Sequence, residues 1–216
     1  MSLPPSASVA FGAQGAKLVA PAATRNVQVI VDLMQQITPP RGAALEIASG
    51  TGQHIVALAQ ALPEIDWQPS EVDADRLASI AAYADEAGLP NLRAPVRLDA
   101  TRPGWARERE PFDMIHLVNL LHLISDEAAG VLISEAAEAL RPGGTLMLYG
   151  PFKRDGVLTS QGDARFDAQL RGADPSIGYK DDAWLKERLT AADLSLTLVQ
   201  DMPANNLAFV ARKGSE

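Results

Sequence analysis

The stretch Glu46-Ile-Ala-Ser-Gly50-Thr-Gly52-Gln53 decides the fold, because it joins a short apolar run to the start of a helical pattern. The run Ala43–Ala48 is typical of a buried strand, and apolar residues between Ile55 and Leu62 recur on one helical face. Gly50 and Gly52 let the backbone approach a ligand without an intervening Cβ, and the helix start beyond them supplies free N–H groups. The stretch therefore predicts a ligand-binding loop between a strand and a helix.

Helical and strand patterns alternate on both sides of this loop, which implies βαβ units, a parallel sheet and helices on both of its faces. Helices are expected over Thr24–Ile37, Asp73–Ala87, Asp126–Leu140 and Asp181–Ala192. A further helix is expected after Gly52, with Ile55, Val56, Leu58, Ala59 and Leu62 on its apolar side and Pro63 at its end. Strands are expected over Ala43–Ala48, Ile65–Ser70, Ala94–Leu98, Phe112–Asn119 and Thr145–Gly150, with Ser195–Gln200 and Leu207–Arg212 as a closing antiparallel pair. Residues 151–179 are expected to be irregular.

Length and composition restrict the class of protein. A chain of 216 residues predicts one domain, here 21–216, preceded by a flexible arm or lid over residues 1–20, which are rich in Ala, Ser, Gly and Pro. The formal net charge of −8 argues against nucleic acid as a partner. No apolar run is long enough to span a membrane, and the absence of cysteine excludes disulfides and fits a reducing compartment, so the cytoplasm is the expected location.

Acidic residues follow the ends of successive predicted strands. Glu46 lies inside a buried strand, where a carboxylate is costly unless a cation such as the amino group or sulfonium of S-adenosylmethionine lies beside it. Glu71 follows the second strand and is suited to accept both hydroxyls of a ribose, with Asp73 as a second candidate. Asp99 follows the third strand and is suited to an adenine amino group, and Asn119-Leu-Leu-His122 leaves the fourth strand. Because ligands of parallel sheets bind at the carboxyl ends of the strands, these side chains are expected to share one site.

These residues resemble class I S-adenosylmethionine-dependent methyltransferases. Glu46–Gly52 is similar to their E/D-x-x-x-G-x-G loop, and Leu140–Leu146 to their usual entry into the fifth strand. The chain resembles more closely the uncharacterised domain-of-unknown-function 938 family, also called the methyltransferase-like protein 26 family. The stretches that carry this resemblance are Pro21–Asn26, Leu45–His54, Trp67–Ser70, Tyr149–Gly156 and Met202–Asn206.

The resemblance implies an α/β, Rossmann-like class I methyltransferase fold. Its mostly parallel, seven-stranded sheet would have the order 3-2-1-4-5-7-6, with strand seven antiparallel and helices on both faces. It further implies S-adenosylmethionine as the cofactor, with its methionine end at Glu46, Gly50 and Gly52, its ribose at Glu71 and its adenine at Asp99. The complete set of expected cofactor-binding residues is Glu46, Ala48, Gly50, Thr51, Gly52, Glu71, Asp99, Ala100 and Asn119.

Methyl transfer from a sulfonium is an in-line displacement with a good leaving group, so positioning supplies much of the acceleration, about 7–11 kcal/mol in well-oriented pairs. A general base helps only where the acceptor must lose a proton. The candidate catalytic residues are His122 and Tyr149. The candidate acceptor-binding residues are Arg25, Asn26, Lys153, Arg154, Asn205 and Asn206. Solvated loop charges remain an alternative interpretation of Lys153 and Arg154, as do simple turn residues for Asn205 and Asn206.

The sequence therefore favours an enzyme, an S-adenosylmethionine-dependent methyltransferase, with a small-molecule acceptor and, as an option, a homodimeric assembly. Asn119–His122 lacks the N/D-P-P-Y/F motif of nucleic-acid amino methyltransferases, and no metal is expected because no cluster has zinc-like spacing. Two alternatives stay open. One is a nicotinamide-dependent oxidoreductase, which Ile55 weakens by replacing the third glycine of G-x-G-x-x-G. The other is a non-catalytic regulatory protein that binds S-adenosylmethionine.

Overall fold

The computed structural model describes residues 7–215, which form two compact units. The amino-terminal unit comprises Val9–Asp99 and Phe112–Leu117, and the carboxyl-terminal unit contains Ala100–Pro111 and the chain from Val118 onward. Residues 1–6 of the expected arm lie outside the described residues. The organisation of residues 21–216 as a single domain stays a prediction.

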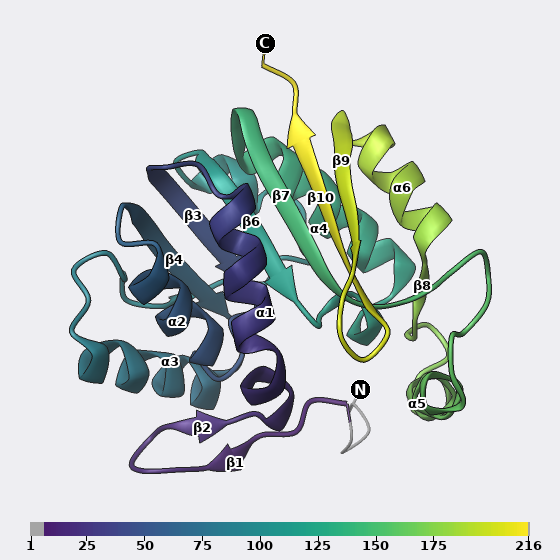
Figure 1. The fold of residues 1–216 in the computed structure, drawn as a ribbon, viewed down its shortest axis with the longest axis horizontal. Helices are drawn as coiled ribbons and strands as arrows, with labels where there is room; N and C mark the ends of the chain where they lie inside the picture. The colour runs from purple at the N-terminus through teal and green to yellow at the C-terminus, as the bar shows by residue number, and fades with distance from the viewer. Residues whose placement is uncertain (1–6, 216) are drawn as a thin grey trace. The chain divides into compact units, whose positions relative to one another are not determined.

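In the amino-terminal unit, strands and helices alternate from α1 onward (Figure 1). Its elements are β1 (Phe11–Gly12), β2 (Leu18–Val19), α1 (Pro21–Ile37), β3 (Gly42–Ile47), α2 (Gln53–Ala61), β4 (Ile65–Glu71), α3 (Ala74–Ala87), β5 (Val96–Arg97) and β6 (Phe112–Val118). Strands β3 to β6 are parallel and lie in the order β5-β4-β3-β6, which is the 3-2-1-4 part of the predicted order. Helix α2 contacts both α1 and α3, and α2 and α3 both contact β4.

Strand β3 lies between two neighbours, β4 and β6, and its residues from Ala44 to Ile47 are all buried. A strand covered on both faces has no solvated side, so its sequence is a continuous apolar run instead of an alternating one. Glu46 interrupts that run with a side chain that is only 2% exposed. A carboxylate at this position needs partners within the protein or in a ligand.

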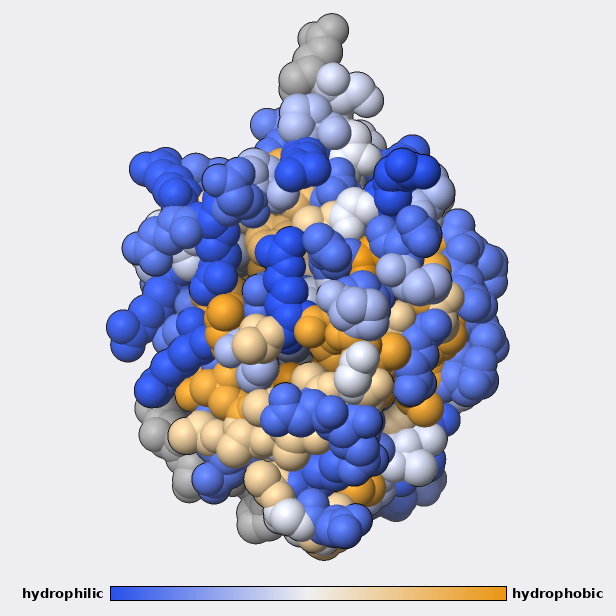
Figure 2. Space-filling view, turned by 90° about the vertical axis from the view of Figure 1, so that its left-hand side faces the viewer, coloured by the Kyte–Doolittle hydropathy of each residue, from blue (hydrophilic) through white to orange (hydrophobic). Residues whose placement is uncertain are grey.

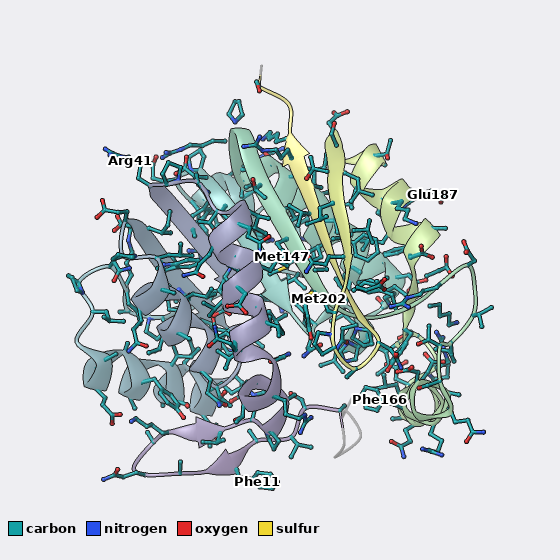
Figure 3. All side chains as sticks on the ribbon, in the orientation of Figure 1. Phe11, Arg41, Met147, Phe166, Glu187 and Met202 are labelled. Atoms are coloured by element: carbon teal, nitrogen blue, oxygen red, sulfur yellow. The ribbon has the colours of Figure 1, made fainter. Side chains whose placement is uncertain are left out.

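The segment before α1 forms a short hairpin. Strands β1 and β2 pair antiparallel, with Phe11 opposite Val19 and Gly12 opposite Leu18. Arg41 marks the amino end of β3 in Figure 3, and Phe11 marks the hairpin on the opposite side, towards which the carboxyl end of β3 points. The described part of the expected arm is thus a hairpin on the side of the glycine loop, and its function as a lid stays a prediction.

The carboxyl-terminal unit contains the remaining elements. They are η1 (Trp105–Glu108), η2 (Leu121–Leu123), α4 (Asp126–Ala139), β7 (Leu140–Lys153), α5 (Gln161–Ala173), β8 (Lys180–Asp181), α6 (Asp182–Ala191), β9 (Leu194–Asp201) and β10 (Asn206–Lys213). Strand β10 lies between β7 and β9 and is antiparallel to both, which confirms the predicted closing pair and gives the 5-7-6 part of the order. Strand β8 pairs with β7 in parallel and is an additional strand that the seven-stranded prediction did not include. The α/β fold class, with a mostly parallel sheet, is confirmed.

The expectation that residues 151–179 are irregular was wrong, because they contain helix α5. The helix buries little apolar surface, with Leu170 as its buried apolar side chain, so local periodicity did not reveal it. Polar contacts stabilise it instead. Ser160 caps its start, and the Asp163 carboxylate accepts hydrogen bonds from Thr159, Ser160, Tyr179 and Asn205.

The surface of the molecule mixes hydrophilic and hydrophobic residues. Figure 2 shows a face on which orange, hydrophobic side chains lie between blue, hydrophilic ones. No helix in residues 7–215 is long and apolar enough to cross a membrane.

Ser160→Ala tests how much the cap contributes to α5. The Ser160 hydroxyl accepts a hydrogen bond from the Asp163 N–H at 3.1 Å, and we expect its loss to lower the free energy of unfolding by about 1 kcal/mol. Ser176→Ala is the matched control, because Ser176 is exposed and its hydroxyl donates locally to Asp174, and it should change stability by less than about 0.5 kcal/mol. Urea denaturation measures both. Equal losses in the two variants would contradict the proposed importance of the cap.

Candidate functional site

The loop between β3 and α2 is folded tightly against β4. Ala48, Gly50 and Gly52 have positive φ angles of 54°, 60° and 95°. The Ser49 N–H donates to the Ser70 carbonyl at 2.8 Å, and the Ser70 hydroxyl donates to the Glu46 carbonyl at 2.7 Å. Because these bonds bridge two adjacent strands, the loop has a fixed conformation at the carboxyl edge of the sheet.

Gly52 is required by both its backbone angle and its surroundings. A Cβ at this position would lie 3.0 Å from the Cα of Ile80 in α3, a contact tighter than nine in ten Cβ contacts, so the backbone of α3 would have to shift. Gly52 is also the N-cap of α2 and has no side chain with which to cap the helix. The first N–H groups of α2 can therefore be satisfied by an anionic group of a ligand. Beside Gly50, in contrast, a Cβ would meet nothing closer than 4.0 Å.

Glu46 has one partnered and one unpartnered carboxylate oxygen. Its Oε1 lies 3.2 Å from Nε2 of His116, which donates, since a carboxylate only accepts. Its Oε2 is buried without a hydrogen-bond partner in the described part of the chain. Burial opposes ionisation, but the hydrogen bond and charge of His116, with smaller effects of His54 and Ser49, hold the pKa of Glu46 below its ordinary value. The result is a buried carboxylate with a free acceptor, which suits a cationic group.

His116 is a residue that the sequence analysis missed. It lies in β6 directly opposite Glu46 in the register with β3, is fully buried, and packs edge-on against Trp67 at 5.6 Å between ring centroids. The signal was present as a single histidine inside the otherwise apolar run Met114–Val118 of this strand. No local sequence pattern, however, predicts that His116 contacts Glu46, because that contact depends on the order of the strands in the sheet.

A second buried pair lies near Glu46. His54, at the start of α2, places Nε2 2.8 Å from Oδ1 of Asn26 in α1. Burial lowers the pKa of His54, and the charge of Glu46 opposes this only in part. Asn26, expected to contact the acceptor, thus uses its amide oxygen within the protein, while Arg25 is exposed on α1. Their roles in acceptor binding stay predictions.

The acid that follows β4 lies against the glycine loop. The Glu71 carboxylate accepts from the N–H of Gly50 at 3.0 Å and from the N–H of Val72 at 2.8 Å. Each of its oxygens has two lone pairs, so Oε2 can accept a further donor such as a ribose hydroxyl. Asp73, the second ribose candidate, caps α3 by accepting from the Arg76 N–H. The geometry thus favours Glu71 over Asp73.

The other expected cofactor residues lie in both units. In the amino-terminal unit, Thr51 is buried between the two glycines, and Asp99 is half-buried after β5. In the carboxyl-terminal unit, the Ala100 carbonyl accepts from Trp105 Nε1 at 3.2 Å. Asn119 has a φ of 58° and donates its N–H to the Tyr149 carbonyl at 2.8 Å. Contact of these residues with a cofactor stays a prediction.

His122, a candidate catalytic residue, lies in an apolar environment in the carboxyl-terminal unit. Its ring packs against Phe166 at 5.8 Å and Tyr179 at 6.1 Å between centroids. Burial, with a smaller effect of the positive charge of Lys180, lowers the pKa of His122 to about 3. The imidazole is therefore neutral at physiological pH but a weak proton acceptor. Its assignment as a general base stays a prediction that this environment does not favour.

The remaining candidates of this unit bond to one another or to nearby acids. The hydroxyl of Tyr149, which is 2% exposed, accepts from Asn206 Nδ2 at 3.1 Å. Asn205 donates to Asp163 at 3.0 Å, and Arg154 forms an ion pair with Asp201 at 2.9 Å. Lys153 is half-buried at the end of β7. These contacts define structural roles, and the catalytic or acceptor-binding roles of the four candidates and of Lys153 stay predictions.

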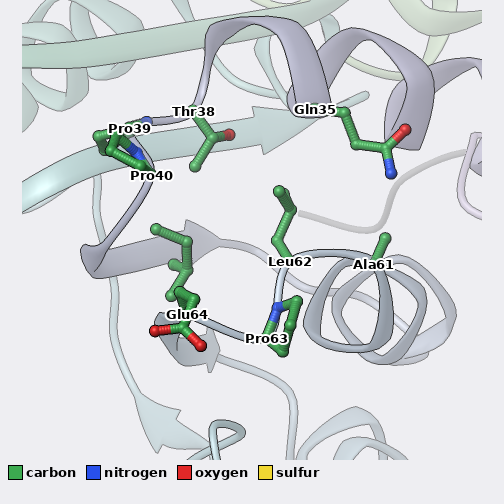
Figure 4. A pocket seen from close by; sticks show the side chains of 9 residues that line it. Gln35, Thr38, Pro39, Pro40, Ala61, Leu62, Pro63 and Glu64 are labelled. Carbon is green, nitrogen blue, oxygen red and sulfur yellow. The ribbon is translucent and has the colours of Figure 1, made fainter.

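A hollow of about 310 Å³ lies at the other edge of the amino-terminal unit (Figure 4). Its walls come from residues that precede β3 and β4 and from the first residue of β4: Gln35, Thr38, Pro39, Pro40, Ala61, Leu62, Pro63, Glu64 and Ile65. Ligands of parallel sheets bind at the carboxyl ends of the strands, so this hollow is not the expected cofactor site. Within residues 7–215, no group of three or more His, Asp or Glu side chains is arranged to hold a metal ion.

Solved structures define the class of this fold. An O-methyltransferase family protein from Burkholderia thailandensis matches with a TM-score of 0.76 at 18% identity, over 90% of this chain and 58% of that one. PigF with SAH matches with a TM-score of 0.73 at 18% identity, over 89% and 56%. CalO1, a methyltransferase in calicheamicin biosynthesis in its SAH-bound form, matches with a TM-score of 0.70 at 16% identity, over 89% and 55%. The chain thus has the methyltransferase fold, and it spans 55–58% of the length of these proteins.

Within this class, the particular family is shown by the sequence as a whole. The family described as Protein of unknown function (DUF938) matches residues 17–213, nearly the entire chain. The protein belongs to this family.

Gly52→Ala tests the tight packing of the glycine loop on α3. The Cβ would lie 3.0 Å from Ile80 Cα at a φ of 95°, so we expect a loss of at least about 1 kcal/mol in the free energy of unfolding. Gly130→Ala is the matched control, since Gly130 lies in α4 with open space around its Cβ position, and we expect it to stabilise the protein by about 0.5–1 kcal/mol. Urea denaturation compares the two. A Gly52→Ala protein as stable as Gly130→Ala would contradict the described packing.

His122 should make the fold sensitive to acid. Its pKa is about 3 in the folded protein against 6.5 for the free side chain, so below pH 6.5 the unfolded chain binds a proton that the native protein does not. The contribution of the neutral imidazole to the free energy of unfolding is therefore fully present above pH 6.5 and is lost as the pH falls below it. The loss between pH 7 and pH 5 is about 2 kcal/mol. His122→Phe has no imidazole to protonate, so between pH 7 and pH 5 its free energy of unfolding should fall by about 2 kcal/mol less than that of the wild type. Urea unfolding at the two pH values measures this difference. The same pH dependence in both proteins would show that His122 is not held neutral.

Proposed function

We propose that this protein is an S-adenosylmethionine-dependent methyltransferase that acts on a small-molecule acceptor. The observation that carries the proposal is the buried, unpartnered Oε2 of Glu46 beside a glycine loop that opens helix α2. An orphaned carboxylate oxygen in a protein core is costly unless a ligand donates to it. The shared fold with SAH-bound methyltransferases supports the choice of ligand.

The residues of the amino-terminal unit fit the functional groups of this cofactor. Glu46 Oε2 is an acceptor for an ammonium group, and the uncapped start of α2 is a donor set for a carboxylate. Glu71, at the edge of the same loop, is an acceptor for a ribose hydroxyl. When bound, S-adenosylmethionine supplies an activated methyl group on a sulfonium.

The residues of this chain are better suited to orient the cofactor and the acceptor than to remove a proton from the acceptor. Glu46 is kept ionised by His116, and the bonds of Ser49 and Ser70 fix the loop on which the cofactor would lie. A weakly basic His122 and a hydrogen-bonded Tyr149 are poorly suited to take a proton from an acceptor of high pKa. We therefore favour an acceptor that needs little assistance in losing a proton.

Two alternatives are less well supported. A nicotinamide enzyme would need a small residue at position 55 for close packing of the helix on the strand, and Ile55 is fully buried there. A regulatory protein that binds the cofactor without catalysis is favoured by the weak basicity of His122, and it makes the same cofactor contacts. Cofactor binding and methyl transfer must therefore be measured separately.

Glu46→Gln tests the cofactor site. Isothermal titration of the wild type with S-adenosylmethionine should show binding, and at about 100 times its Kd the ligand should add about 2.7 kcal/mol to the free energy of unfolding. The variant loses the charge that faces the ammonium group, so we expect its Kd to rise at least about tenfold. Glu64→Gln, in the hollow at the other edge, is the matched control and should bind like the wild type.

The outcomes separate the three functions. Binding of NADH but not S-adenosylmethionine would support the oxidoreductase, and binding of neither would contradict the proposal. Transfer of a tritiated methyl group to the small-molecule fraction of a cell extract would exclude a purely regulatory role. Cofactor binding with no transfer to any fraction would favour that role.

A further inference from the structure

Ser79 connects the second strand of the hairpin to the glycine loop. This serine of α3 is fully buried, and its hydroxyl is used twice. It accepts from the N–H of Leu18 in β2 at 2.8 Å, and it donates to the carbonyl of Thr51 at 2.8 Å. Thr51 is the residue between the two glycines. A single side chain therefore joins the backbone of the amino-terminal segment to the backbone of the glycine loop.

Gln53 makes a second, separate connection between the same two segments. Its side-chain oxygen accepts from the N–H of Ala20 at 2.7 Å and from the hydroxyl of Thr51 at 2.9 Å. Its amide nitrogen donates to the hydroxyl of Thr24, in the first turn of α1, at 2.9 Å. Gln53 directly follows Gly52 and is the first residue of α2, so the side chain that leaves the glycine loop also binds the start of α1.

The segment itself is attached along α3. Lys17 forms an ion pair with Glu86 and lies over the ring of Tyr83, with 4.9 Å between Nζ and the ring centroid. Tyr83 also flanks the loop, because a Cβ on Gly52 would lie 3.5 Å from its ring. In Figure 1 the hairpin lies beside the ends of α1 and α3 on the same side of the sheet as this loop.

We propose that residues 17–24, which we call the clasp, favour the conformation of the glycine loop that binds the cofactor when they are docked on α3. Gln53 and Ser79 are the positioning residues that couple the clasp to this loop. Both residues act through Thr51, and the proposal assigns neither a contact with the cofactor. The inference rests on the proposed function, since it names what orders the loop that would hold the cofactor.

The coupling must act in both directions. If the docked clasp favours the loop conformation that binds the cofactor, then the cofactor favours the docked clasp by the same factor. The two backbone N–H groups that report docking are those of Leu18 and Ala20, because each donates to a coupling side chain. Their hydrogen exchange should therefore slow when the cofactor binds.

The test measures exchange and affinity on the full-length protein. Hydrogen exchange at Leu18 and Ala20 is followed with and without saturating S-adenosylmethionine, in the wild type and in Gln53→Ala. We expect slower exchange at both amides in the bound wild type, and about a tenfold higher Kd for Gln53→Ala, because one side chain loses three hydrogen bonds. In Gln53→Ala, the cofactor should slow hydrogen exchange at the amides of Leu18 and Ala20 less than in the wild type. The reduction in this protection should be about the same factor as the rise in Kd.

Gln28→Ala is the matched control, since Gln28 lies on the exposed side of α1 and its side chain donates to Asp32 of the same helix. It should leave both the Kd and the exchange rates unchanged. Ser79→Ala removes the second connection and should weaken binding in the same direction as Gln53→Ala. A structural role alone would lower the stability of Gln53→Ala without changing cofactor-dependent protection, and that result would overturn the proposal.

Measurements of cofactor binding and hydrogen exchange on the wild-type protein test this inference and the proposed function separately. Binding of S-adenosylmethionine without any change in exchange at Leu18 and Ala20 overturns the clasp and leaves the proposed function standing. Absence of binding to the wild type contradicts the proposed function, and the clasp as a part of a cofactor site fails with it.

Discussion

The burial of one carboxylate in a central strand is the constraint on which the amino-terminal unit depends. Glu46 is 2% exposed between β4 and β6, and an isolated charge there would cost several kcal/mol. His116 on the neighbouring strand supplies one hydrogen bond, which fixes the register of β6 against β3, since a one-residue slip would turn His116 to the other face. Within residues 7–215 the second carboxylate oxygen has no partner, so the charge is only partly compensated, and this is the observation from which we propose a ligand at Glu46.

The rest of the loop geometry follows from the same strand. Because β3 ends one residue after Glu46, the chain must turn at once, and Ala48, Gly50 and Gly52 do so with positive φ angles. The turn places the N–H of Gly50 on Glu71, so the acids of two adjacent strands are connected through the backbone of one loop. Strain in such a loop persists only where the surroundings hold it, and the hydrogen bonds of Ser49, Ser70 and Ser79 do this.

The sequence predicted the features that depend on local pattern. The strand before Gly50, the helix after Gly52 and the acid at Glu71 each have a signature within a few residues, and the antiparallel closing pair is marked by its apolar runs. The partner of Glu46 was not predictable, because His116 lies 70 residues further along the chain and meets Glu46 only through strand order. Helix α5 was missed for a related reason. Its Asp163 carboxylate accepts hydrogen bonds from Tyr179 and Asn205, and neither contact leaves a periodic pattern in residues 161–173.

The chemistry of the carboxyl-terminal unit limits how a methyl transfer could be accelerated. Several candidate catalytic and acceptor-binding residues of this unit already have partners within the protein. Asn206 is hydrogen-bonded to Tyr149, Asn205 is hydrogen-bonded to Asp163, and Arg154 forms an ion pair with Asp201. Its histidine has lost basicity through burial. Groups held in this way can orient an acceptor but are poor at exchanging protons with it. Positioning is also the larger contribution in an in-line displacement with a good leaving group, at about 7–11 kcal/mol against the about 3–5 kcal/mol that a 10²–10⁴-fold base effect represents. A protein without a strong base is therefore compatible with the methyl transfer that we propose. Such a transfer would depend on a well-ordered glycine loop, and the hydrogen bonds of Gln53 and Ser79 to Thr51 tie that loop to the rest of the amino-terminal unit.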